Sequence, residues 1–243
     1  MMPCADRQEM AYNAQVAVDE ISELIVAEEV VNEESDNRRL VPMLDEVKEN
    51  LGEVAEATVA DGGYKSSVAL GEAEQKGYAV LVNWGGDASG KQLGPYHKSR
   101  FCHQTEEDVV ICPPGERLEF EGIKTNRGKR FAVRGYRGRK FRDCPVRAQC
   151  SRNRQGRLIE ITPYDAAVAK QRANRRDPQK QKLLRKREVI VEPVFGVIKQ
   201  AWGFRRWTLR GLENVRTQWS MLCVAFNLKK MYKVWAAGEL ALA

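Results

Sequence analysis

The chain has 243 residues, of which 43% are hydrophobic and 30% are charged, so it can bury a core and is not disordered throughout. No apolar run approaches the roughly 20 residues that cross a bilayer, and no signal-peptide pattern opens the chain, so we expect an intracellular protein without a membrane span. Six cysteines are too few for a disulfide scaffold of this length.

Charge is divided unevenly along the chain. Residues 1–90 hold 6 Lys and Arg against 19 Asp and Glu, whereas residues 91–243 hold 34 against 14. The first part therefore has a balance of −13 and the second a balance of +20. A basic part of this size exceeds what solubility requires, which favours nucleic acid as a partner over a merely solvated surface.

The N-terminal part predicts a β-hairpin followed by a helix. Residues 11–18 alternate between apolar and polar side chains, and residues 24–31 hold a second apolar run close enough to pair with the first. Ser35 or Asp36 then supplies an N-cap, and apolar residues recur at helical spacing through residues 40–51.

A strand–helix–strand unit follows. Residues 57–60 form a short apolar strand, Ser66 or Ser67 caps the next helix, and residues 78–82 form another strand. Such a unit predicts a parallel crossover. Asp61 and two glycines end the first of these strands, and ligands of open α/β sheets bind beyond the carboxyl ends of strands.

The amino-acid composition changes in the second half of the chain. Residues 84–162 mix short strands, glycines, cysteines and dense Lys and Arg, and we interpret them as an insertion in the α/β framework. Residues 163–191 predict basic helices with a break at Pro178, and residues 211–234 predict an amphipathic helix. We therefore divide the chain into residues 1–83, the insertion 84–162, and C-terminal helices over 163–243 that complete the core.

Two acidic residues are candidates for chemistry. Asp61 could bind a divalent metal through oxygen, or it could cap the next helix or form an Asx turn. Its best partner is Glu192, which adjoins an apolar helical stripe formed by Val191, Phe195, Ile198 and Trp202. Lys199 lies two turns after Glu192, too far for a direct ion pair, so both are expected to face a third body such as a metal or a phosphate. The alternative is a first-turn Glu that satisfies the helix dipole.

The insertion offers cysteines and arginines. Cys102 or His103 with Cys112, Cys144 and Cys150 could form a zinc site, but no Cys-x2-Cys pair exists, so packed or free thiols are favoured and zinc is not expected. Basic residues with interleaved aromatics predict contacts to a DNA backbone, with a solvated surface as the alternative. Those proposed to bind DNA are Arg134, Arg137, Arg139, Lys140, Arg205 and Arg206.

Four segments resemble blocks that occur in the same order in bacterial insertion-sequence transposases of the DDE type. They read AYNAQVAVD (11–19), VADGGY (59–64), VEPVFGVIK (191–199), and LRGLENVR (209–216) followed by AFNLKK (225–230). The resemblance is to the insertion-sequence-four-like group and covers nearly the whole chain. It implies a ribonuclease H-like α/β fold with a basic, cysteine-containing insertion.

The resemblance also implies an activity and its residues. The second and third catalytic carboxylates would be Asp61 and Glu192, 131 positions apart. They would hold Mg²⁺ or Mn²⁺ for cleavage and transfer of DNA strands by the two-metal chemistry of phosphoryl transfer. In the family signature Tyr-x2-Arg-x3-Glu-x6-Lys, Glu192 and Lys199 match, but Arg185 and Glu188 occupy the upstream positions. Arg187, one place from the arginine, would serve as the phosphate contact in its stead, so the resemblance adds Arg187 and Lys199 to the expected DNA contacts.

The first aspartate of the family has no counterpart here. It lies in an Asp-Gly-Thr-like strand before the segment at 11–19, and Asp6 and Asp19 match other positions. We therefore expect the C-terminal part of a transposase, either a decayed copy or half of an interrupted frame, with little or no activity alone. A non-catalytic DNA-binding remnant and a metal-dependent nuclease of the same fold are the alternatives, so whether the chain is an enzyme stays open. DNA is the expected partner, a homo-oligomer is an option, and the expected location is the bacterial cytoplasm at the nucleoid.

Overall fold

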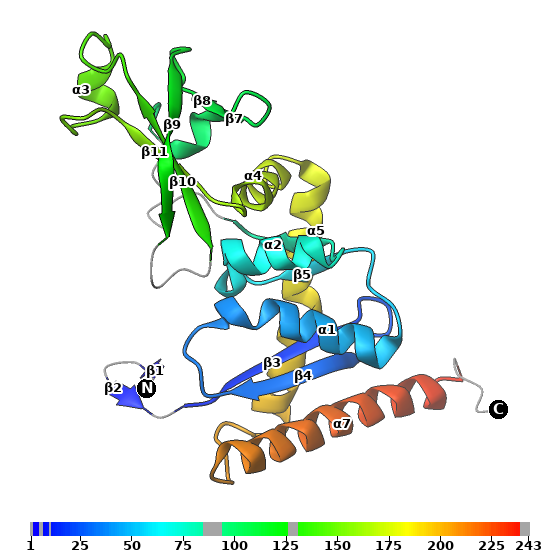
Figure 1. Cartoon of the computed structure of the whole chain (residues 1–243). Helices are drawn as coiled ribbons and strands as arrows, with labels where there is room; N and C mark the ends of the chain where they lie inside the picture. Colours follow the sequence, from blue (N-terminus) through cyan, green and yellow to red (C-terminus); the bar gives the residue numbers. More distant parts are fainter. Residues whose placement is uncertain (1, 5–6, 10, 85–93, 126–130, 239–243) are drawn as a thin grey trace. The chain divides into compact units, whose positions relative to one another are not determined.

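The computed structural model describes residues 2–4, 7–9, 11–84, 94–125 and 131–238, and the chain is a mixed α/β protein of two compact units (Figure 1). The first unit comprises Met1–Asn83 and Asn174–Ala243, and the second is Trp84–Ala173. The second unit covers residues 84–173, whereas the expected insertion covers residues 84–162. Asp6, the whole glycine-rich loop at 85–90, and the basic residues Arg127, Lys129 and Arg130 lie outside the described residues.

The first unit opens with antiparallel strands. β1 (Met2–Cys4) pairs with β2 (Arg7–Glu9), and β3 (Asn13–Val18) pairs with β4 (Ile25–Val31), which confirms the expected hairpin. Ser35 caps the short 3-10 helix η1 (Asp36–Arg38), which leads into α1 (Leu40–Leu51).

The predicted strand–helix–strand unit is present. It consists of β5 (Thr58–Ala60), the 3-10 turn η2 (Gly62–Tyr64), α2 (Ser67–Gln75) and β6 (Val80–Val82). β5 and β6 are parallel, with Thr58 opposite Val80, as the crossover predicts. Ser66 caps α2 by accepting a hydrogen bond from the Ala69 amide at 3.3 Å. The pair β5–β6 and the pair β3–β4 form separate two-stranded sheets within the described part of the unit.

Four C-terminal helical segments complete the first unit. They are α5 (Pro178–Ile190), which begins at the predicted break, α6 (Glu192–Gly196), the π-helical turn η4 (Val197–Ala201) and the long α7 (Leu212–Ala236). α5 packs against β5 and β6, and α7 packs against β4. Asn227 ties α7 to the hairpin because its side chain both donates to and accepts from the Ile25 backbone, each at 2.8 Å.

The segment after Glu192 packs inward along most of its predicted stripe: Ile198 is buried, and the partly buried Phe195 and Trp202 pack against the same core cluster. Val194 and Ile198 are its buried residues, whereas Val191 and Phe195 are only half-buried. α5 ends before Glu192, and the short helix α6 is followed by the π-helical turn η4. The buried positions of this segment therefore do not follow a single 3.6-residue period. These residues pack against α7 through a cluster completed by Ile25, Val30, Val215, Trp219, Cys223 and Phe226.

The second unit is built on a five-stranded antiparallel sheet in the order β11-β10-β9-β8-β7. Its elements are η3 (Lys98–Arg100), β7 (Cys102–Gln104), β8 (Val109–Ile111), β9 (Arg117–Thr125), β10 (Ala132–Gly138), α3 (Arg147–Cys150), β11 (Leu158–Ile161) and α4 (Asp165–Asn174). Val110, Leu118, Tyr136 and Ile159 form its core. The Tyr136 hydroxyl donates to Asp108 at 2.6 Å and accepts from Arg134 at 3.0 Å, so its burial leaves no unpaired polar group. None of the helices in the described ranges is long and apolar enough to cross a bilayer.

Candidate active site

Asp61 stands at the carboxyl end of β5, where the chain leaves the parallel pair. It is the N-cap residue of η2 by position, yet its side chain makes no capping hydrogen bond. The Tyr64 amide instead donates to the Asp61 backbone carbonyl at 3.1 Å. The carboxylate is 59% exposed and remains available to a partner, which disfavours the interpretation of Asp61 as a cap.

Glu192 is the first residue of α6, with Pro193 directly after it. Its side chain is 64% exposed. A carboxylate in the first turn of a helix is favoured by the positive end of the helix dipole, although a helix this short contributes little. Both candidate acids are therefore accessible to solvent.

Arg187 of α5 links the two acids. Its Nη2 atom lies 3.6 Å from Oδ1 of Asp61 and 3.7 Å from Oε1 of Glu192, and its side chain is only 23% exposed. The packing of α5 against β5 and β6 positions this guanidinium at the carboxyl end of the strands. Two carboxylates separated by 131 positions in the chain thus share one cation.

Asp36 braces the turn that carries Asp61, a role that the sequence interpretation missed. Its Oδ1 accepts hydrogen bonds from the side chains of Asn13 and of Gln15, the latter at 2.7 Å. Its Oδ2 lies so close to Gly63 that a Cβ atom on this glycine would come within 2.5 Å. An acid before a helix looks like a capping residue in sequence, so no local signal distinguishes this long-range role.

Negative charge accumulates around η2. Burial raises the pKa of Tyr64 above its ordinary value, and the charges of Asp36, Asp61 and Glu29 raise it further. Since these three carboxylates all act on one phenol, they contribute to a common negative field. Such a field favours the binding of a cation at the exposed acids.

The chemistry of these donors fits a hard divalent cation. Mg²⁺ prefers carboxylate oxygens, retains several waters, and is often held by one or two carboxylates of the protein. Arg187 already occupies a position within ion-pair distance of both acids, which shows that a positive charge is accommodated there. No cluster of three or more His, Cys, Asp or Glu side chains suited to a metal occurs among the described residues.

Three of the arginines that are expected to bind DNA are engaged in ion pairs within the sheet of the second unit. Arg134 pairs with Asp108 at 2.6 Å, Arg137 with Glu121 at 2.6 Å, and Arg139 with Glu119 at 2.5 Å. An arginine in an ion pair is less available to a phosphate, because binding to DNA must compensate for the broken pair. The exposure of Arg139, at 79%, leaves it the least constrained of the three.

The remaining expected DNA contacts are dispersed. Lys199 lies over the Phe195 ring, 5.4 Å from its centroid, rather than beside Glu192. Arg205 donates to Gln200 Oε1 at 2.6 Å, and Arg206 is exposed in the same loop. Lys140 borders a small cavity in the second unit.

That cavity, of about 60 Å³, brings together Cys112, Cys144 and Cys150. Burial raises the pKa of Cys112 and of Cys150, which keeps these thiols protonated at neutral pH. Cys102 is exposed, and the Nε2 atom of His103 lies 3.0 Å from the Tyr136 hydroxyl. Thus the structure gathers three of the cysteines and engages the histidine elsewhere.

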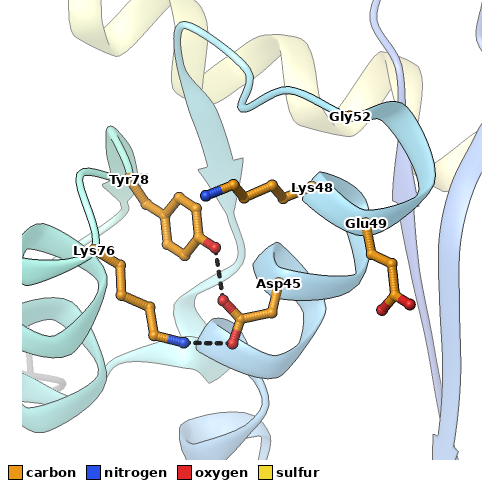
Figure 2. A pocket seen from close by; sticks show the side chains of 6 residues that line it. All are labelled: Asp45, Lys48, Glu49, Gly52, Lys76 and Tyr78. Carbon is orange, nitrogen blue, oxygen red and sulfur yellow. Dashed lines mark hydrogen bonds and ion pairs between the residues drawn. The ribbon is translucent and has the colours of Figure 1, made fainter.

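A larger open pocket of about 490 Å³ lies away from this site (Figure 2). Its residues Asp45, Lys76 and Tyr78 belong to α1, the end of α2 and the segment before β6. Because Tyr78 precedes β6 whereas Asp61 follows β5, the pocket is at the amino edge of the parallel pair and the acids are at its carboxyl edge. Ligands of such sheets bind at the carboxyl edge, so we place the candidate site at Asp61 and Glu192.

Comparison with known families gives one match. A family model described as "Transposase DDE domain" matches residues 111–232, which is half of the chain. The matched range includes Glu192, Arg187 and Lys199, and it begins after Asp61. No curated protein and no solved structure matches the chain.

Proposed function

The chain belongs to the family of the transposase DDE domain, and from this membership we propose that it acts on DNA by metal-dependent phosphoryl transfer at Asp61 and Glu192. The observation that carries the proposal is the shared ion pair with Arg187. Folding brings together the two acids that the family resemblance identifies, at the carboxyl end of a parallel strand. If Asp61 and Glu192 only capped their own helices, nothing would require their side chains to lie close together across 131 positions of the chain.

Each residue has a role in this proposal. Asp61 and Glu192 hold the divalent cation, Mg²⁺ or Mn²⁺, and Asp36 keeps the turn that carries Asp61 in place. A cation held by these acids would supply Lewis-acid stabilisation of the phosphate while a water or 3′-hydroxyl oxygen attacks phosphorus and loses its proton to solvent, and the bridging oxygen leaves with the electron pair of its bond to phosphorus. Arg187 is released from the acids and contacts the phosphate, for which a guanidinium fork is suited.

The core of the first unit supports a ribonuclease H-like fold as part of the proposal. It combines an antiparallel hairpin, a parallel pair joined through α2, and helices α1 and α5 that pack beside these strands. The second unit then corresponds to an insertion between Asp61 and Glu192. We further propose that the chain belongs to the insertion-sequence-four-like group.

We propose that the chain alone binds metal weakly and has little strand-transfer activity. Two exposed carboxylates provide fewer anionic ligands than two dications share in phosphoryl-transfer sites. DNA is the proposed substrate, so the proposed place of action is the cytoplasm at the nucleoid.

Metal titration of the purified chain tests the proposal. Mn²⁺ binding measured by calorimetry should be detectable in the parent and lost in Asp61→Asn and in Glu192→Gln. Asp45→Asn removes an exposed acid from the pocket of Figure 2 and is the matched control that keeps the signal. Equal binding by all four proteins would refute a metal site at Asp61 and Glu192.

A DNA assay distinguishes the alternatives. Supercoiled DNA and a labelled duplex are incubated with the chain and Mg²⁺ or Mn²⁺, and nicking and joining are followed on gels. If the chain binds DNA but binds no metal ion through Asp61 and Glu192, it is a non-catalytic remnant. Cleavage that requires Asp61 but never yields joined product indicates a nuclease of the same fold.

A further inference from the structure

The long helix α7 has two apolar faces, and within the part of the chain that the structure describes only one of them is covered. Val215, Trp219, Cys223 and Phe226 face the first unit's core and are at most 4% exposed. On the opposite side lie six large side chains that are between 46% and 68% exposed. We call these six the outer stripe: Met221, Val224, Leu228, Met231, Tyr232 and Trp235.

The spacing of the outer stripe is that of a helix–helix seam. Five of its members, 221, 224, 228, 231 and 235, follow one another at alternating intervals of three and four. This heptad spacing keeps apolar side chains in line with a second helix over two full heptads. An apolar face that only covers a globular core is broader and follows a period of 3.6 residues.

The outer stripe is also symmetric about Leu228. Four residues to either side stand Val224 and Tyr232, and seven residues to either side stand Met221 and Trp235. In an antiparallel pair of identical helices centred on Leu228, each of these residues therefore meets an apolar residue of the other copy. Such an isologous contact has the two-fold symmetry of the commonest oligomers.

Charge does not oppose this pairing. Residues 217–235 hold three charged side chains, Lys229, Lys230 and Lys233, and all lie three, four or seven positions after Phe226, on the covered side. Lys230 pairs with Glu23, and Lys229 lies 5.6 Å from the centroid of the Trp202 ring. The seam of two copies would therefore contain no like charges, and the opposed helix dipoles of an antiparallel pair attract each other.

The available area suits a dimer. A buried aromatic side chain removes roughly 150–250 Å² from water, so Tyr232 and Trp235 at about half exposure offer on the order of 100 Å² each. With four aliphatic side chains of comparable exposure, the stripe supplies most of the roughly 800 Å² per partner that a stable interface buries. Large exposed apolar patches on proteins mark interaction sites.

We propose that α7 is a dimerisation helix, which pairs antiparallel with α7 of a second copy of this chain through the outer stripe, with Leu228 on the two-fold axis. The inference rests on α7 alone and is independent of the proposed catalytic site. Sedimentation equilibrium of the full chain, from about 0.1 to about 100 µM, should show a dimer that dissociates on dilution in this range.

A charge placed on the axis tests the interface. In Leu228→Lys two ammonium groups would meet at the seam, so the dissociation constant should rise at least tenfold. Because Leu228 is exposed in the monomer, the circular dichroism spectrum should not change. The matched control is Ile21→Lys, since Ile21 is an apolar residue of the same unit that is 94% exposed, and it should leave the dimer intact.

Cross-linking tests the register. Leu228→Cys should give a disulfide-linked dimer on mild oxidation above the background of the parent chain, because the two copies of residue 228 face each other. Val224→Cys should not, since Val224 faces Tyr232 of the other copy. A parent chain that is monomeric throughout, an intact dimer in Leu228→Lys, or cross-linking through residue 224 would each overturn the proposal.

Discussion

The guanidinium of Arg187 lies 3.6 Å from the carboxylate of Asp61, on an element that follows Asp61 by more than a hundred residues. Since Arg187 pairs with Glu192 as well, one positive charge serves two acids that would otherwise repel each other. In the proposed mechanism the same charge would compete with a metal cation, so metal binding would require Arg187 to leave the two acids.

Removal of Arg187 should strengthen metal binding. Arg187→Gln frees both acids, and because they are more than half exposed each pair stabilises the arginine form by only about 0.2–1 kcal/mol. Together the two pairs correspond to about 0.4–2 kcal/mol, so we expect the affinity for Mn²⁺ to rise about two- to thirtyfold by calorimetry, while DNA affinity falls. Arg185→Gln removes an equal charge from the exposed side of the same helix and is the control. An unchanged affinity in Arg187→Gln would show that the arginine does not compete with the metal.

The DNA interface should depend on the arginines that lie outside ion pairs with acids. Replacement of Arg205 and Arg206 by Gln should lower the dependence of log K on log salt by about 0.9 for each phosphate that the variant no longer neutralises. Replacement of Arg137 and Arg139 by Gln removes the same charge, but these residues are paired with Glu121 and Glu119. We expect the second pair of changes to alter the slope less, as measured by fluorescence anisotropy at several salt concentrations. A larger change of the slope in the variant of Arg137 and Arg139 would mean that their ion pairs with Glu121 and Glu119 break when DNA binds.

Gly63 should tolerate no side chain, because a Cβ atom there would come within 2.5 Å of Asp36 Oδ2. Gly63→Ala displaces Asp36 from its hydrogen bonds with Asn13 and Gln15, and we expect a loss of about 1–3 kcal/mol in the free energy of unfolding. Metal binding at Asp61 should weaken as well. Gly62→Ala is the matched control, since its nearest neighbour is the flexible end of Lys65 at 3.4 Å. Equal denaturation midpoints for the two variants would contradict the bracing role of Asp36.

The pocket of Figure 2 should make stability depend on acidic pH. A hydrogen bond from Lys76, and then one from Tyr78, hold the pKa of Asp45 below its ordinary 3.8, and the bond to Asp45 raises the pKa of Tyr78 to about 12. A lowered carboxylate pKa stabilises the fold above the unfolded value, and this contribution is lost as pH falls through the folded value.

Asp45→Asn should therefore be less stable than the parent near neutral pH, by about 1 kcal/mol or less because Asp45 is 44% exposed. The difference should vanish as pH falls below 3.8, as followed by urea denaturation at several pH values. Glu49→Gln, in the same pocket, is the control and should show no such loss near neutral pH. A difference that persists at low pH would exclude the charged form of Asp45 as its source.

Local pattern sufficed for much of the first unit. Alternation predicts β3, an apolar run predicts β4, and the serines at 66 and 67 predict where α2 begins. Pro178 predicts where α5 begins, and the strand–helix–strand pattern predicts the parallel pair. After Glu192 the pattern correctly predicts that Ile198 is buried, but it misses Val194, which is fully buried just before the π-helical turn.

The sequence by itself determined the order of strands and helices, the separation of charge and the two candidate acids, since these depend on composition and on neighbouring residues. Only the tertiary structure decided what each charged side chain does. Arg187 meets Asp61, Arg137 meets Glu121, and Asp36 meets Gln15 because distant segments pack together, and no spacing in the chain encodes such a meeting. The same holds for α7: the sequence predicts an amphipathic helix, and it is the packing of one face against the hairpin that reveals a second, exposed apolar face.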